Sequence, residues 1–100
     1  MADTDKELGG IGSYVLFEND VVKVWQNDLK PGESSDWHLH ENNYLFVATV
    51  HGDLAIEHKS GEKHDTTLEP GSVVMGEKDS IHQLSNRGDT LYSSVIIEIK

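Results

Sequence analysis

The sequence predicts an all-β domain of the sandwich or barrel type. Turn-forming residues recur roughly every eight to twelve positions, as they do between the short strands of such domains. No stretch shows the period of about 3.6 residues that marks an amphipathic helix. Leu29-Lys30-Pro31-Gly32 and Leu68-Glu69-Pro70-Gly71 form a weak internal repeat, which suits the two Greek-key halves of a jelly roll.

The first half of the chain contains three predicted strands. Residues 14–17 and 21–27 are rich in β-branched and aromatic side chains, which favour an extended backbone. Pro31 followed by Gly32 indicates a type II turn. Residues 43–50 form a long apolar run, so this strand is expected to be buried on both sides.

The second half repeats this pattern with shorter segments. His51-Gly52-Asp53 indicates a hairpin turn, and Pro70-Gly71 a second type II turn. The predicted strands here are residues 54–57, 66–68, 73–75, 81–85 and 91–99. Residues 13–100 are therefore expected to form one domain, and the acidic, glycine-rich residues 1–12 a flexible N-terminal arm.

The charge balance argues against several kinds of partner. The 18 acidic and 8 basic residues give a net charge of −10. Such a surface repels phosphate backbones and anionic lipids, so neither nucleic acid nor a membrane is an expected partner. No apolar run approaches the roughly 18 residues of a membrane span, and the first residues lack the pattern of a signal peptide. A cytoplasmic location is therefore expected.

Histidines are the candidate metal ligands because the chain has no cysteine. A transition metal must then be held by imidazole or oxygen ligands. His38 and His40 are two residues apart, and on a strand they would point to the same face, with Cα atoms roughly 6.6 Å apart. Two imidazoles at this spacing can converge on one ion. The alternative is a pair on an exposed strand surface.

The residues that share a face with these histidines predict a cavity. If His38 and His40 point inward, the alternation of a strand makes the following even-numbered residues point inward too. A third histidine, His82, can lie opposite them on a distant strand of a barrel. The predicted lining is small and partly apolar, and comprises Tyr44, Phe46, Met75 and Leu84.

The spacing of glycines and histidines resembles the two motifs of the cupin superfamily. The matching residues are Gly32, His38, His40 and Gly52 in the first motif and Gly71, His82 and Asn86 in the second. The resemblance covers roughly residues 20–99 and implies a double-stranded β-helix. Glu77 and Asp79 replace a proline and a glycine of the second motif, and both are compatible with a turn.

One residue of the family pattern is missing, namely the metal-binding glutamate. Tyr44 is the inward residue nearest to its expected position. The resemblance therefore implies a three-histidine site, formed by His38, His40 and His82. It would hold one divalent transition metal, with Fe²⁺ expected first and Zn²⁺, Mn²⁺ or Ni²⁺ as alternatives. Because these ligands are neutral, the ion would keep its full charge, which favours anionic substrates.

The resemblance implies a metal-dependent enzyme for a small molecule. A non-haem Fe(II) dioxygenase and a metal-assisted isomerase or lyase are both compatible with the ligands. Tyr44 would then move a proton or hydrogen-bond a bound ligand, unless it is a core aromatic residue. Gln26 would orient a substrate, unless it lies on an exposed strand. The alternative function is a non-catalytic sensor or carrier that binds a small molecule.

The remaining expectations concern surfaces. His51, His58 and His64 lie at or near predicted turns and are expected on the surface. The apolar edge strand at residues 14–17 is expected to pair with a second copy, which predicts a homodimer. No Gly-x-Ser-x-Gly motif of a hydrolase is present.

Overall fold

A computed structural model describes residues 9–76 and 78–100 of the chain, and these residues form two antiparallel β-sheets without helices. The strands are β1 (Tyr14–Glu18), β2 (Val22–Leu29), β3 (His38–His40), β4 (Asn43–Ala48), β5 (Gly52–His58), β6 (Lys63–Leu68), β7 (Val73–Gly76), β8 (Ser80–Asn86) and β9 (Tyr92–Ile99). The prediction of an all-β fold is confirmed. No helix in the described part is long and apolar enough to cross a membrane.

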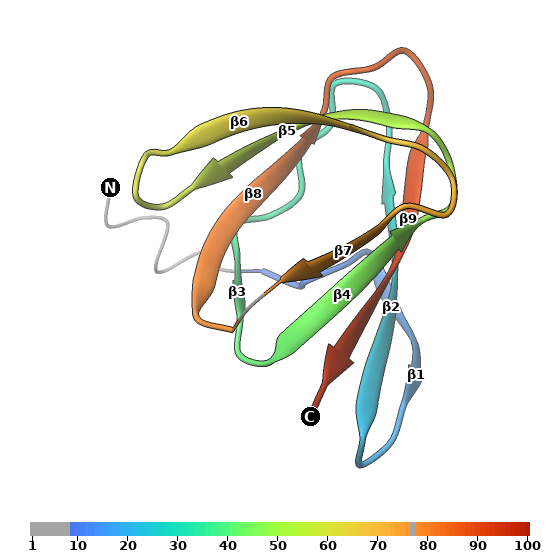
Figure 1. Ribbon diagram of the computed structural model, residues 1–100, viewed down its shortest axis with the longest axis vertical. Helices are drawn as coiled ribbons and strands as arrows, with labels where there is room; N and C mark the ends of the chain where they lie inside the picture. Colours follow the sequence, from blue (N-terminus) through green and yellow to red (C-terminus); the bar gives the residue numbers. More distant parts are fainter. Residues whose placement is uncertain (1–8, 77) are drawn as a thin grey trace.

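The two sheets face each other as a jelly roll (Figure 1). The five-stranded sheet has the order β1-β2-β9-β4-β7, and the four-stranded sheet has the order β3-β8-β5-β6. From β2 onward the chain passes repeatedly between the sheets, so strands far apart in sequence become neighbours. This arrangement is the double-stranded β-helix that the paired motifs imply.

The two predicted type II turns are confirmed. Gly32 and Gly71 have positive φ values of 80° and 92°, which only glycine adopts without strain. The Glu33 amide donates to the Lys30 carbonyl at 2.9 Å, and the Ser72 amide donates to the Glu69 carbonyl at 2.9 Å. The first turn precedes β3, which carries His38 and His40. The second precedes β7, which is followed by β8 and its His82.

Asp79 occupies the position at which the second cupin motif has a glycine. It is the one non-glycine residue with positive φ in the described chain, at 74°. Aspartate tolerates this left-handed conformation better than most residues. The Asp79 amide donates to the His40 carbonyl at 2.6 Å, so the substituted turn still fastens the start of β8 to the end of β3.

The expectation that residues 43–50 form one strand buried on both sides is wrong in two respects. The strand ends at Ala48, and Thr49 and Val50 are exposed. Only the inner face of β4 carries buried side chains, those of Tyr44 and Ala48, whereas Leu45 and Val47 on the other face remain half-exposed. The outer face of this sheet is therefore apolar without being covered by the rest of the chain.

The hydrophobic core lies at the end of the interior away from the histidines. It consists of Leu29, Ala48, Leu54, Leu68 and Tyr92. A Cβ at Gly52 would overlap the Tyr92 ring, which explains the glycine of the first motif. Asn86 of the second motif is buried and donates its amide to the Leu29 and Thr90 carbonyls, both at 2.9 Å. These motif residues stabilise the barrel rather than line the site.

Candidate metal centre

Strand register brings the three predicted ligands together. β3 pairs with β8 so that His38 lies directly opposite His82, and His40 lies opposite Ser80. Cross-strand partners share a face of the sheet, so His38 and His82 point to the same side. His40 is two residues from His38 and therefore joins them. All three side chains enter the space between the sheets, where His38 and His40 are buried and His82 is half-buried.

The three imidazole rings form a nearly equilateral triangle. Their centroids are 4.8 Å apart for His38 and His40, 4.6 Å for His38 and His82, and 4.8 Å for His40 and His82. The Nε2 atoms of His40 and His82 are 3.1 Å apart. Two nitrogen ligands at 2.0–2.1 Å from one ion, with angles between 90° and 109°, would be about 2.8–3.4 Å apart. One ligand atom from each histidine lies within 4.8 Å of the others, which fits a metal ion.

The electrostatics keep these imidazoles neutral, as metal ligands must be. Burial, reinforced by the neighbouring histidines, lowers the pKa of His40 to about 3. Burial likewise lowers the pKa of His82 to about 3 and that of His38 below its ordinary value. The His38 Nδ1 donates to the Asp36 carbonyl at 2.8 Å, which leaves its Nε2 lone pair free for an ion.

His40 is the most enclosed of the three ligands, with 1% of its surface exposed. Its Nδ1 is buried and has no hydrogen-bond partner among the described residues. Its ring stacks on Tyr44, with centroids 3.6 Å apart and planes inclined by 13°. An unpaired buried ring nitrogen costs stability, and ligation of an ion through Nε2 would not by itself satisfy Nδ1.

Tyr44 lies beside the triangle rather than within it. Its ring centroid is 6.4 Å from that of His82, and its hydroxyl is hydrogen-bonded to the Ser80 side chain. Burial raises the pKa of Tyr44 above its ordinary value, so the hydroxyl stays protonated. A Cβ at Gly76 would overlap the Tyr44 ring, so the glycine makes room for this side chain. Tyr44 thus supports His40 by stacking.

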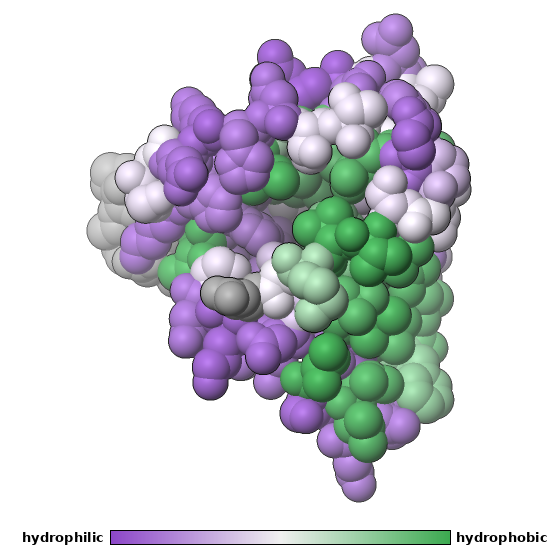
Figure 2. Space-filling view, in the orientation of Figure 1, coloured by the Kyte–Doolittle hydropathy of each residue, from purple (hydrophilic) through white to green (hydrophobic). Residues whose placement is uncertain are grey.

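Two adjoining cavities reach the histidines. A narrow cavity of about 40 Å³ is bounded by all three ligands, by Tyr44, Phe46 and Leu84 as predicted, and by Ile11, Asn27, Ser35, Ile56, Ser94 and Ile96. A wider cavity of about 400 Å³ lies on the other side of Tyr44 and His82 and includes Met75 at its rim. Figure 2 shows the surface hollowed between the β5–β6 and β4–β7 pairs, where the wider cavity opens.

Gln26 does not reach either of these cavities. It lies opposite Val95 on the outer face of the sheet, and its amide donates to the Asp28 carboxylate at 2.7 Å. Its neighbour Asn27 is buried and lines the narrow cavity instead. The orientation of β2 was hard to predict. In most half-buried strands the apolar residues face inward, whereas on β2 the apolar Val22 and Val24 face outward and the polar Asn27 faces inward.

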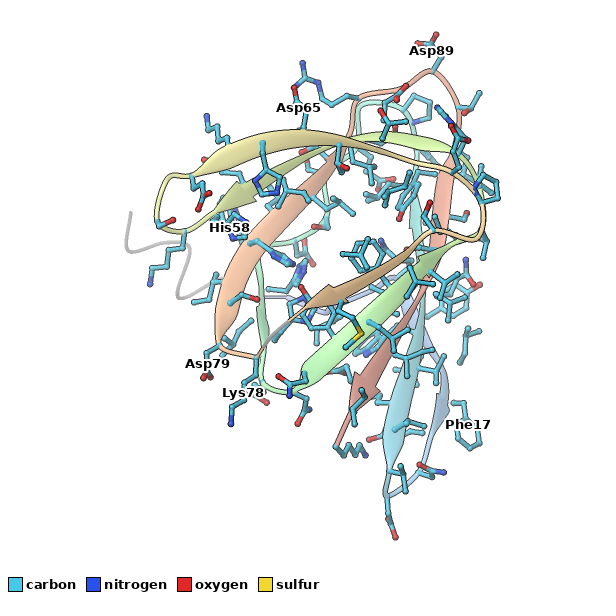
Figure 3. The ribbon with its side chains drawn as sticks, in the orientation of Figure 1. Phe17, His58, Asp65, Lys78, Asp79 and Asp89 are labelled. Carbon is cyan, nitrogen blue, oxygen red and sulfur yellow. The ribbon has the colours of Figure 1, made fainter. Side chains whose placement is uncertain are left out.

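His58 was expected on the surface, and the structure corrects this. His58 pairs directly with His82 across β5 and β8, is half-buried, and has its ring centroid 5.6 Å from that of His82 (Figure 3). His64 is exposed as expected but also lines the wider cavity. The alternation Leu54-x-Ile56-x-His58 was the signal that places His58 inward. His51 is exposed, as expected, and its Nδ1 lies 2.9 Å from the Glu69 carboxylate.

The predicted arm at residues 1–12 falls mostly on residues 1–8, which lie outside the described part. Within the described part, the Gly9 amide donates to the Trp37 carbonyl at 2.8 Å. Ile11 is half-buried and lines the narrow cavity. Residues 9–12 therefore contact the segment that leads into β3.

Fold and site together define a double-stranded β-helix with a three-histidine site that could hold a metal ion. A scan against protein-family models matches residues 26–97 to the family described as Cupin domain. The chain belongs to the cupin family, as its motifs had indicated. A search of the curated proteins found no match.

Solved structures agree with this assignment. A cupin domain from Bordetella pertussis is 31% identical, with a TM-score of 0.82 over 94% of this chain and 96% of that chain. A cupin 2 conserved barrel domain protein from Salinispora arenicola is 20% identical, with a TM-score of 0.67 over 86% and 72%. An oxalate oxidase bound to the substrate analogue glycolate is 17% identical, with a TM-score of 0.62 over 76% and 40%. The last two likenesses concern the fold alone.

Proposed function

We propose that this chain is a metal-dependent enzyme that acts on a small molecule, and that it is an Fe(II)-dependent dioxygenase. The observation that carries the proposal is the convergence of three neutral imidazoles beside two adjoining cavities. Three protein ligands leave coordination positions open, which is typical of a catalytic rather than a structural metal. The absence of a carboxylate at the position of Tyr44 is consistent with an ion that retains its charge for an anionic substrate.

When bound, a ferrous ion would supply Lewis-acid chemistry and one-electron chemistry toward dioxygen. The side chains around it have separate tasks. His38 is oriented by its bond to the Asp36 carbonyl, and His40 by its stack on Tyr44. Phe46, Ile56 and Ile96 give the narrow cavity part of its apolar wall.

Tyr44 acts in this proposal as a positioning residue. Its proton is held firmly, because burial raises its pKa, so it is a hydrogen-bond donor at neutral pH and not a base. Its hydroxyl already has a partner in Ser80. Proton transfer therefore falls to the substrate or to a group on the ion.

The test begins with chain purified without oxygen and supplied separately with Fe²⁺, Zn²⁺, Mn²⁺ or Ni²⁺. Metal content is measured first, and oxygen consumption is then followed on a panel of small carboxylic and hydroxy acids. The proposal expects one Fe²⁺ per chain and oxygen uptake with at least one acid. His82→Ala should abolish both, whereas His51→Ala, an exposed histidine outside the site, should change neither.

The outcomes separate the alternatives. If no ion binds in stoichiometric amount, the metalloenzyme proposal fails. If an ion binds and acids bind without consuming oxygen, the dioxygenase assignment fails, and a metal-assisted isomerase, a lyase or a non-catalytic carrier is left.

A further inference from the structure

The wider cavity contains two histidines that the metal triangle does not use. Its lining is Tyr44, Phe46, Ile56, His58, His64, Val74, Met75, Gly76, Lys78, Asp79, Ser80 and His82. Its volume of about 400 Å³ is within the range of small-molecule sites. His82 and Tyr44 belong to both cavities, so a molecule in the wider cavity can reach the ligand triangle.

His58 and His64 form a pair of hydrogen-bond donors in this cavity. Their ring centroids are 5.5 Å apart and their planes are inclined by 31°. Within residues 9–76 and 78–100, the ring nitrogens of both residues make no hydrogen bond. Even a neutral imidazole carries one N–H donor, so two donors are available at neutral pH without any protonation.

The two charged residues among the described lining of this cavity have opposite signs and cancel, so recognition of an anion depends on the imidazole N–H donors. Lys78 also lines the cavity, and Asp79 is the one carboxylate among the lining residues. Both lie in the loop that leads into β8, and Figure 3 shows their side chains pointing outward, away from His58.

We propose that His58 and His64 bind a carboxylate at the far end of the substrate, while its near end reaches the metal triangle. This inference rests on the proposed function and names its substrate class. The substrate would be a small hydroxy acid or related chelating acid that carries a second carboxylate. A carboxylate has two acceptor oxygens, which suits two N–H donors from neighbouring rings. The short distance of 5.6 Å between the His58 and His82 rings requires the two ends to be only a few bonds apart.

The test compares acids that share a chelating end. Lactate, malate and 2-hydroxyglutarate all carry an α-hydroxycarboxylate, but only the last two have a second carboxylate. Binding is measured by calorimetry on the Fe²⁺-loaded chain without oxygen. Malate or 2-hydroxyglutarate should bind at least about tenfold more tightly than lactate, which corresponds to one hydrogen bond to a charged group.

Variants then locate the preference. In the double variant His58→Ala, His64→Ala, malate and 2-hydroxyglutarate should bind about as tightly as lactate. The lactate affinity and the metal content should stay unchanged. His64→Ala alone, at an exposed position, guards against a folding defect, and His51→Ala is the matched control. Equal binding of lactate and malate, binding of neither acid to the loaded chain, or a preference that survives the double variant would overturn the inference. Loss of metal binding itself would instead refute the proposed function.

Discussion

Replacing Gly76 by alanine should weaken metal binding from a position that touches no metal ligand. A Cβ at this position would overlap the Cζ, Cε1 and Oη atoms of Tyr44. Tyr44 is buried and stacks on His40 at 3.6 Å, so the ring cannot retreat without moving that ligand. The added methyl group therefore acts on the metal site through one intervening side chain.

The magnitude follows from the overlap. Forcing an extra methyl group into a packed interior costs about 1–3 kcal/mol, which for a domain of this size lowers the melting temperature by roughly 4–8 °C per kcal/mol. Disturbing a residue that orients a metal ligand costs about 10–100-fold in metal affinity. Gly76→Ala should therefore show both a lower melting temperature without metal and a weaker Fe²⁺ affinity.

Gly88→Ala is the matched control. A Cβ there meets its nearest neighbour, Asn86 Oδ1, at 3.4 Å, which is an ordinary contact. Melting and metal titration of the two variants should therefore diverge. Adding Tyr44→Leu to Gly76→Ala removes the overlapping atoms, so the double variant should be more stable than the sum of the single effects predicts. Additive effects, or a Gly76→Ala variant as stable as Gly88→Ala, would refute this account of Tyr44.

The other predictions concern pH and the motif asparagine. The pKa values of His40 and His82 are about 3 in the folded chain, against about 6.5 when unfolded, so only the unfolded chain takes up protons between these values. The metal-free protein should lose stability as the pH falls from about 6.5 toward 3, by at most about 1.4 kcal/mol per pH unit for each histidine and by less for the half-buried His82. Urea unfolding at pH 7, 6 and 5 measures this, and equal midpoints would contradict it. Asn86→Ala removes two bonds to backbone carbonyls and one from the Gly88 amide, so it should cost about 2–4 kcal/mol in urea unfolding, whereas a cost below 0.5 kcal/mol would show these bonds to be dispensable.

Much of this architecture could be predicted from local chemistry. The type II turns followed from Pro-Gly pairs, because proline fixes φ and only glycine adopts the next conformation freely. His38, His40 and His82 followed from alternation and from their place in the motif pattern. Residues 41 and 42, where the chain changes sheets between β3 and β4, could not be recognised, because nothing in the local pattern marks a change of partner strand.

The inner and outer faces of the five-stranded sheet were harder to predict. Gln26 and Asn27 are adjacent polar residues, and the usual rule that polar residues point outward cannot decide between them. His58 looked like a turn residue because β5 extends one position further than expected, up to His58 itself. Both cases depend on which strand lies alongside, and that information is distributed over residues far apart in the chain.

The position of β3 has a consequence for how an ion enters the site. This strand has three residues and lies at the edge of its sheet, and among residues 9–76 and 78–100 it is paired only with β8, yet it carries two of the three ligands. Short edge strands open locally at a much lower free energy than global unfolding requires. Metal exchange should therefore proceed through fraying of β3, at a rate that amide hydrogen exchange of Leu39 would report. An ion that bridges His40 and His82 would close this edge and slow that exchange.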